Sequence, residues 1–216
     1  MRDLAMSNRV KSHSPARTPK LPRRFSALLS AVAGAALLSG CISFGEDPPE
    51  QLLTLTPQSR IEAGADREGS IGAALAVMEP TTSQRLNVNR VPVSTTDSSL
   101  AYLQNAFWVE KPAKLFRSVL AETIRSGGKR FVVDGGDIIY AAPVQLTGEL
   151  VEMGYDAPSS SAVVVFDAML MDASGALRTQ RFEHRVEGVR AEALDVGRAL
   201  NEAANAVAAD VAEWVG

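Results

Sequence analysis

The stretch VQLTGELVEMGYDAPSSSAVVVFDAMLMDASGALRTQRFEHRVE, from Val144 to Glu187, contains three apolar runs separated by turn-forming residues. Runs of this length that are rich in β-branched and aromatic residues are typical of β-strands. The segment Asp172 to Ala176 separates the last two runs, and Gly175 can adopt the positive φ of a tight hairpin. The stretch therefore predicts an antiparallel meander between Pro143 and Arg190. Its third strand has two alternating faces, one of which carries Arg178, Gln180, Phe182, His184 and Val186.

Two other segments have the periodicity of helices. Between Pro112 and Arg125, apolar side chains recur at helical spacing, with proline in the first turn and Gly127-Gly128 after the last. The C-terminal segment EALDVGRALNEAANAVAADVAEWV predicts a long closing helix. Its apolar stripe consists of Leu200, Ala203, Val207, Val211 and Trp214.

Shorter apolar runs predict further strands. Gln51 to Pro57 is expected to form a first strand, and Ile71 to Pro80 a buried central strand. A short helical piece is expected between Thr82 and Leu86, before the strand NVNRVPVST. Because Pro92 cannot donate a hydrogen bond to a neighbouring strand, that strand is expected to be an edge strand or to contain a bulge. The fold class is α/β: a mixed, largely antiparallel sheet packed with two main helices in a layered sandwich, forming a single domain over residues 51–216.

The first 40 residues differ from the rest. They contain seven of the 22 Lys and Arg residues but only one of the 25 acidic residues, and they end in an uncharged run from Phe25 to Gly40. A basic segment, an apolar run too short for a comfortable membrane span, and small residues at its end are the parts of an export signal. Its removal leaves 15 basic and 24 acidic residues. That balance argues against nucleic-acid binding, which needs a basic face.

The single cysteine follows this run, in the sequence Leu38-Ser39-Gly40-Cys41. A lone cysteine can be a buried thiol, a nucleophile or an attachment point. The order of basic segment, apolar run and small residues favours a lipobox, in which signal peptidase recognises residues 38–40 and Cys41 receives diacylglyceryl and a further acyl chain such as palmitate. Residues 1–40 are then the lipoprotein signal peptide, and residues 41–50 form a lipidated tether that reaches at most about 30 Å.

The residue after the cysteine is Ile42, at the position where an aspartate would favour retention in the inner membrane. By resemblance to enteric lipoproteins, this indicates the outer membrane, with the domain facing the periplasm.

The sequence offers little catalytic chemistry. Without the signal, His184 is the only histidine, and a single histidine on an amphipathic strand is more often a packed or surface residue than a base. No HExxH motif, Cys cluster, GxSxG motif or dinucleotide fingerprint occurs. Asp134 and Asp137 could ligate calcium, but a glycine-rich turn is the simpler interpretation of VDGGD. We therefore expect no catalytic residue, no metal site and no cofactor.

Three aromatic residues lie close together near the end of a predicted strand: Tyr102, Phe107 and Trp108. Aromatic side chains anchor many protein interfaces, so the group could form a partner-docking patch. The alternative is packing in the hydrophobic core.

In order and spacing, the mature sequence resembles the ABC-type transport auxiliary lipoprotein family, which includes the paraquat-inducible type of outer-membrane lipoprotein. The matching segments are LSGC, QLLTLTP, LAVMEP, LNVNRVPV, LAYLQNAFWVEKPAKLFRSVL, LTGELVEM, the strand pair around FDAML and the alanine-rich last helix. Gln51 stands where the family usually has an aromatic residue.

The resemblance implies a partner role. Such lipoproteins are thought to accompany an ABC transporter or a membrane protein with Mce (mammalian-cell-entry) domains, often as a ring of identical copies. This chain would then be a non-catalytic docking subunit of an intermembrane phospholipid transport system. The alternatives are an envelope lipoprotein that regulates or scaffolds cell-wall synthesis, and an anchored hydrolase.

Overall fold

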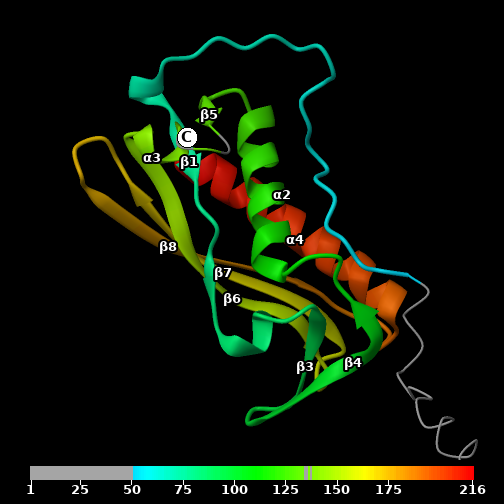
Figure 1. Ribbon diagram of the computed structural model, residues 1–216. Helices are drawn as coiled ribbons and strands as arrows, with labels where there is room; N and C mark the ends of the chain where they lie inside the picture. The colour runs from blue at the N-terminus through cyan, green and yellow to red at the C-terminus, as the bar shows by residue number, and fades with distance from the viewer. Residues whose placement is uncertain (1–50, 134–135, 137) are drawn as a thin grey trace, which may run out of the picture. The chain divides into compact units, whose positions relative to one another are not determined.

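The computed structural model describes residues 51–133, 136 and 138–216, all within one compact unit that spans residues 48–216. The unit combines a mixed sheet of eight described strands with two main helices, as the sequence predicts (Figure 1). In chain order the strands are β1 (Leu75–Val77), β2 (Thr81–Thr82), β3 (Arg90–Thr96), β4 (Ser99–Phe107), β5 (Val132–Val133), β6 (Val144–Asp156), β7 (Ser161–Met171) and β8 (Leu177–Val186). The helices are α2 (Pro112–Ser126), the short α3 (Ile138–Ala141) and α4 (Ala193–Val215), and two 3-10 turns lie at Ile71–Ala73 and Gln84–Leu86.

The long strand β6 organises the sheet. On one side it pairs antiparallel with β7, which pairs with β8, so the predicted meander is confirmed. On its other side β6 pairs in parallel with β1, β2 and β3 at successive positions along its length. The parallel pairs need crossover connections, and the chain segment between β4 and β6 contains α2.

The core lies between the sheet and the two main helices, which lie next to one another (Figure 1). Phe116 of α2 and Phe166 of β7 are both buried and meet edge to face, with ring centroids 5.2 Å apart. The closing helix α4 covers β7 and β8 through its predicted apolar stripe, of which Leu200, Ala203 and Val207 are fully buried. Trp214, at the end of the stripe, packs edge-on against Phe182 of β8. Both helical predictions are therefore confirmed.

The prediction for Pro92 was half wrong. Strand β3 lies between β4 and β6 and is not an edge strand. The alternative of a bulge is confirmed, because the pairing of β3 with β4 shifts register between Arg90 and Pro92. The shift removes the demand for a ladder hydrogen bond at the proline, and β4 is the strand that lies at this margin of the sheet.

The predicted first strand, Gln51 to Pro57, was wrong beyond a single bridge between Leu53 and Trp108. The segment instead runs along α4, where asparagine side chains satisfy its backbone. Asn201 Oδ1 accepts a hydrogen bond from the Thr56 N–H at 2.7 Å, and Asn205 Oδ1 accepts one from the Gln58 N–H at 2.7 Å. Asn205 Nδ2 also donates to the Thr56 carbonyl at 3.0 Å. We call residues 51–58 the strap; it attaches the start of the domain to its last helix.

Asn205→Ala tests the strap. Asn205 is 5% exposed, and its loss leaves the Gln58 N–H and the Thr56 carbonyl without these partners. We expect the free energy of unfolding to fall by about 2–3 kcal/mol, measured by urea denaturation. Asn201→Ala removes one exposed hydrogen bond and should cost about 1 kcal/mol or less. Equal, near-zero losses for both variants would mean that the strap is not held in this way.

Candidate functional site

Of the three aromatic residues that the sequence groups together, Trp108 lies in the core. It is 1% exposed, and its bridge to Leu53 places both side chains inward. Its backbone N–H donates to the Asn89 carbonyl at 3.0 Å. This position matches the core-packing alternative for Trp108 and removes this side chain from any docking surface of the folded domain.

Tyr102 and Phe107 are half-buried and hold an arginine between them. The Arg90 Cζ atom lies 5.3 Å from the centroid of the Tyr102 ring and 5.4 Å from that of Phe107. The irregular register of β4 makes this possible, because Tyr102 pairs with Pro92 whereas Phe107 pairs with Arg90. The residues between them form a bulge in which Asn105 has a φ of 54°. The two rings thereby approach the same guanidinium group.

Arg90 has no anionic partner among the described residues. Its Nε atom is buried without a hydrogen-bond partner, and it forms no ion pair with a described carboxylate. A guanidinium group between aromatic rings keeps a fixed orientation and is suited to planar or phosphate anions. Sequence reasoning missed Arg90 as a functional residue. The signal that could have found it is its alternation with Val91, which places it on the opposite face from the core.

Exposed apolar side chains lie on the chain segments next to this arginine and to the Leu53–Trp108 bridge. Leu52 is 54% exposed, Val109 47% and Leu194 55%. Leu52 and Val109 flank the inward-facing pair Leu53 and Trp108 along their two segments, and alternation turns them outward. Leu194 lies in the first turn of α4, one turn before Gly197. At Gly197 the strap passes so closely that a Cβ atom added to this glycine would lie 2.6 Å from Leu53 Cδ2. We call the set Leu52, Arg90, Tyr102, Phe107, Val109 and Leu194 the tether-end surface, since the described chain begins there.

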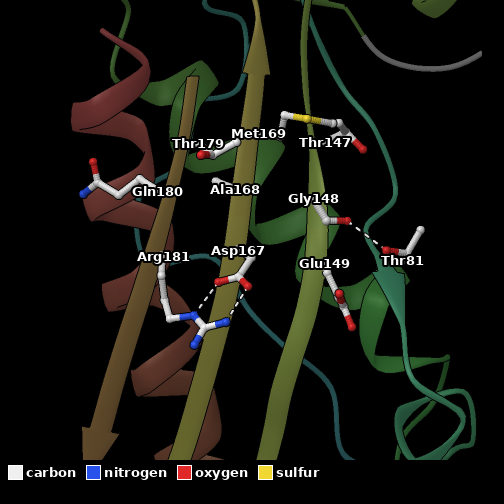
Figure 2. A pocket seen from close by; sticks show the side chains of 10 residues that line it. All are labelled: Thr81, Thr147, Gly148, Glu149, Asp167, Ala168, Met169, Thr179, Gln180 and Arg181. Carbon is white, nitrogen blue, oxygen red and sulfur yellow. Dashed lines mark hydrogen bonds and ion pairs between the residues drawn. The ribbon is translucent and has the colours of Figure 1, made fainter. Parts of the chain in front are cut away.

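A second feature is an open trough of about 670 Å³ on the sheet face that points away from α4 (Figure 2). Its lining comes from β2, β6, β7 and β8 and includes both polar residues and Gly148, Ala168 and Met169. Figure 2 shows Asp167 and Arg181 facing each other across neighbouring strands, with two N–O distances of 2.6 Å. Gly148 forms part of the floor with a φ of 152°, and a Cβ atom there would lie 2.1 Å from the Asp167 carbonyl oxygen. The side chains of the trough are paired with each other or open to solvent, so they form no evident reactive group.

The pH dependence of the Asp167–Arg181 pair gives a second prediction. The hydrogen bond from Arg181 lowers the pKa of Asp167 below its ordinary value. A lowered pKa in the folded state contributes stability at neutral pH that is lost as the pH falls through that pKa. Arg181 is largely exposed and Asp167 is more than one-third exposed, so Asp167→Asn should reduce stability only slightly, and much less than Asn205→Ala. In thermal unfolding, the small difference between Asp167→Asn and the unaltered protein should shrink as the pH is lowered from neutral through the lowered pKa of Asp167; a difference that grows in acid would contradict this account.

The described part of the chain contains no group of three or more His, Cys, Asp or Glu residues arranged to hold a metal ion. His184 is half-buried on β8 opposite Val164, on the face that the sequence predicts. Among the described helices, none is both long enough and apolar enough to cross a bilayer.

The lipobox lies outside the described residues, and it consists of Leu38, Ser39, Gly40 and Cys41. The two possible calcium ligands also lie outside them, namely Asp134 and Asp137. The predictions for the lipobox, the tether and the calcium alternative therefore stay predictions.

Comparison with known proteins identifies the family. No curated protein matches the sequence. Among solved structures, a Xanthomonas campestris protein of the family labelled DUF330 superimposes with a TM-score of 0.59 at 16% identity, covering 77% of this chain and 92% of that one. An uncharacterized protein gives the same TM-score and identity, with 76% and 96% covered. These two similarities establish the fold. A PelC dodecamer from Paraburkholderia phytofirmans reaches a TM-score of only 0.39 at 16% identity, over 67% of this chain and 92% of that one.

The family model for the ABC-type transport auxiliary lipoprotein component matches residues 53–212, from the strap to the last turns of α4. This range includes nearly all of the described domain, and it confirms the resemblance found in the sequence. The chain therefore belongs to the family of ABC-type transport auxiliary lipoprotein components.

Proposed function

We propose that the protein is a lipoprotein anchored in the outer membrane, with its domain in the periplasm. We further propose that it is a non-catalytic docking subunit of an Mce-type ABC system that transports phospholipid between membranes. The observation that carries the proposal is the family match over residues 53–212, because an auxiliary component of ABC transport acts through its partners. The fold alone would not indicate a function.

The anchor part of the proposal is supported by the order of segments in the chain. The lipobox sequence Leu38 to Cys41 ends ten positions before the first described residue, Gln51. Two or three acyl chains on Cys41 would hold the protein firmly, since each buried methylene group contributes about 0.8 kcal/mol. Ile42 after the cysteine supports transfer to the outer membrane.

The docking part of the proposal is supported by the surfaces of the domain. The tether-end surface combines exposed apolar side chains with half-buried Tyr102 and Phe107, so these two residues remain candidates for contact with a partner or with lipid. The trough presents polar side chains that are paired or solvated. Both features suit binding to another molecule, and the partners would be the Mce-domain protein, the transporter components and, in a ring, further copies of this chain.

A genetic test follows. If the protein is a subunit of the transport system, deleting its gene and deleting the gene of the permease should cause the same sensitivity of the outer membrane to detergent. Deleting both should add nothing further. Additive defects, or synthetic defects with a cell-wall synthase in place of the permease, would overturn the proposal in favour of the cell-wall alternative.

A further inference from the structure

The unpaired charge of Arg90 is the starting point. Its Nε atom is shielded from water and has no acceptor, and the rings of Tyr102 and Phe107 occupy its neighbourhood in place of a carboxylate. Burying part of a cation without an anionic partner is costly, whereas a charge-assisted hydrogen bond to a phosphate or carboxylate is strong. The Arg90 guanidinium group is thus positioned to bind an anion that comes from outside the domain.

The acidic residues that follow the exposed apolar side chains Val109 and Leu194 do not supply that anion. Glu110, which follows the exposed Val109, forms an ion pair with Lys114. Asp195, which follows the exposed Leu194, forms an ion pair with Arg190 at 2.6 Å. These two acids are thus paired with other bases, and Arg90 has no described anionic partner although the domain as a whole is acidic.

The residues that precede the described chain indicate where the membrane would lie relative to the tether-end surface. The described chain begins at Gln51, beside Leu52 of the tether-end surface, and Cys41 is ten residues earlier. Ten residues span roughly 30 Å at most, so a bilayer that holds an acylated Cys41 lies within reach of this surface.

A comparable exposed apolar side chain lies at the opposite end of α4. Leu177, 59% exposed, precedes Arg178, which donates to the Trp214 carbonyl at the C-terminal end of the helix. The strap and Leu194 lie at its N-terminal end, and a helix of 23 residues is about 34 Å long. Figure 1 shows that the described chain enters beside the start of α4, close to the end of β4. The tether-end surface is therefore an apolar surface that the tether would keep near the membrane.

We propose that the tether-end surface rests on the phospholipid bilayer that holds the anchor. Leu52, Val109 and Leu194 enter the interfacial region, and Arg90 binds the phosphate of a lipid headgroup between the rings of Tyr102 and Phe107. This inference rests on the anchoring at Cys41 that belongs to the proposed function. An acidic segment of a partner protein could also offer an anion to Arg90, but only the bilayer is brought to this end of the domain by the tether itself.

The test uses the mature lipoprotein reconstituted in vesicles of phosphatidylethanolamine and phosphatidylglycerol. Acylation consumes the thiol of Cys41, the single cysteine, so one introduced cysteine can be labelled uniquely with a polarity-sensitive fluorophore. In Val109→Cys in phospholipid vesicles, we expect the emission of the label to be blue-shifted relative to that of a label in water. The matched control is Leu177→Cys, which is at least as exposed as Val109 but lies at the far end of α4, and the emission of its label should stay that of a label in water.

Arginine variants in the Val109→Cys background separate the phosphate contact from simple proximity. Arg90→Gln should reduce the fraction of blue-shifted label about tenfold, while Arg90→Lys should keep part of it because the charge remains. Arg178→Gln is the matched control, since Arg178 also lies over an aromatic ring, 4.8 Å from the centroid of Trp214, but at the other end of the domain. Vesicles of an uncharged galactolipid, which lack phosphate, should behave like the Arg90→Gln variant. Circular dichroism verifies that each variant is folded.

The outcomes are distinct. Equal emission from the labels at positions 109 and 177, or a shift at 109 that ignores both Arg90→Gln and the loss of phosphate, would overturn the membrane-contact proposal. A shift at 109 that appears only when an acidic partner protein is added would overturn it in favour of that partner. Mass spectrometry of the N-terminal peptide is read separately: absence of acyl chains on Cys41 would overturn the anchor of the proposed function, whereas an acylated protein with an unshifted label refutes only the surface contact.

Discussion

Cys41→Ala is expected to abolish incorporation of labelled palmitate and to leave the full 216-residue precursor uncleaved. In the proposed lipobox, the thiol is the group that would accept diacylglyceryl, and lipoprotein signal peptidase would cut only after that modification. Alanine has no nucleophile, so the effect is complete loss of labelling and not a graded decrease. The measurement is metabolic labelling followed by gel electrophoresis, which also reveals the larger precursor.

A matched control lies two residues further on. Ser43→Ala also removes a small polar side chain from the segment after the apolar run, but it leaves the thiol in place. It should be labelled and cleaved normally. Labelling of Cys41→Ala at the level of the unaltered protein would refute the anchor, whatever the fate of the other predictions.

Trp108→Ala is expected to produce the largest loss of stability. Trp108 is 1% exposed and belongs to the core that Leu53, the sheet and the helices share. Removing a buried aromatic side chain of this size costs about 3–5 kcal/mol, from the lost burial and from the cavity that remains. A typical domain has only about 5–15 kcal/mol in total. The variant should therefore unfold at a much lower urea concentration, measured by circular dichroism.

The comparison with Trp214→Ala sharpens this prediction. Trp214 is half-buried and packs on one side against Phe182, with ring centroids 5.7 Å apart, so its loss should cost about 1–2 kcal/mol. If Trp108→Ala were as stable as the unaltered protein but no longer bound its partners, Trp108 would have to face outward, and the core position would be incorrect.

The strongest sequence patterns predicted the framework correctly for a physical reason. Helix α2 and helix α4 carry apolar stripes that only a helix can bury together, and Gly175 has a φ of 86° in the hairpin between β7 and β8. Alternation in β8 likewise identifies Phe182 as its buried member. In these segments the local preference and the tertiary packing agree.

The sequence predictions were wrong where residues far away in the sequence determine the local structure. The strap alternates as a strand does, but its partners are Asn201 and Asn205, nearly 150 positions away, which a reading of Gln51 to Pro57 could not include. Pro92 suggested an edge strand because a single sequence does not reveal that β6 lies beyond β3. The aromatic group divides for the same reason, since the bridge with Leu53 turns Trp108 inward while the bulge in β4 turns Tyr102 and Phe107 toward Arg90.

The strap also has a mechanical consequence for an anchored protein. If residues 41–50 form the proposed tether, a force on it would pass through Leu53 and the two asparagines to α4, the longest described helix. The hydrogen bonds of Asn205 are largely shielded from water, which makes them harder to break than exposed ones. The proposed tether would thus be attached through a core element and not through a peripheral strand.

The central claim is that this lipoprotein acts as a docking subunit, and partner capture tests it most directly. The full-length protein, tagged at its C-terminus, is purified from cells after mild cross-linking and solubilisation, and the bound proteins are identified by mass spectrometry. Our account predicts that an Mce-domain protein and the permease and ATPase of an ABC transporter are enriched with the unaltered protein and are lost with Cys41→Ala. Recovery of cell-wall synthases in their place, or of no transport component from correctly acylated protein, would contradict it.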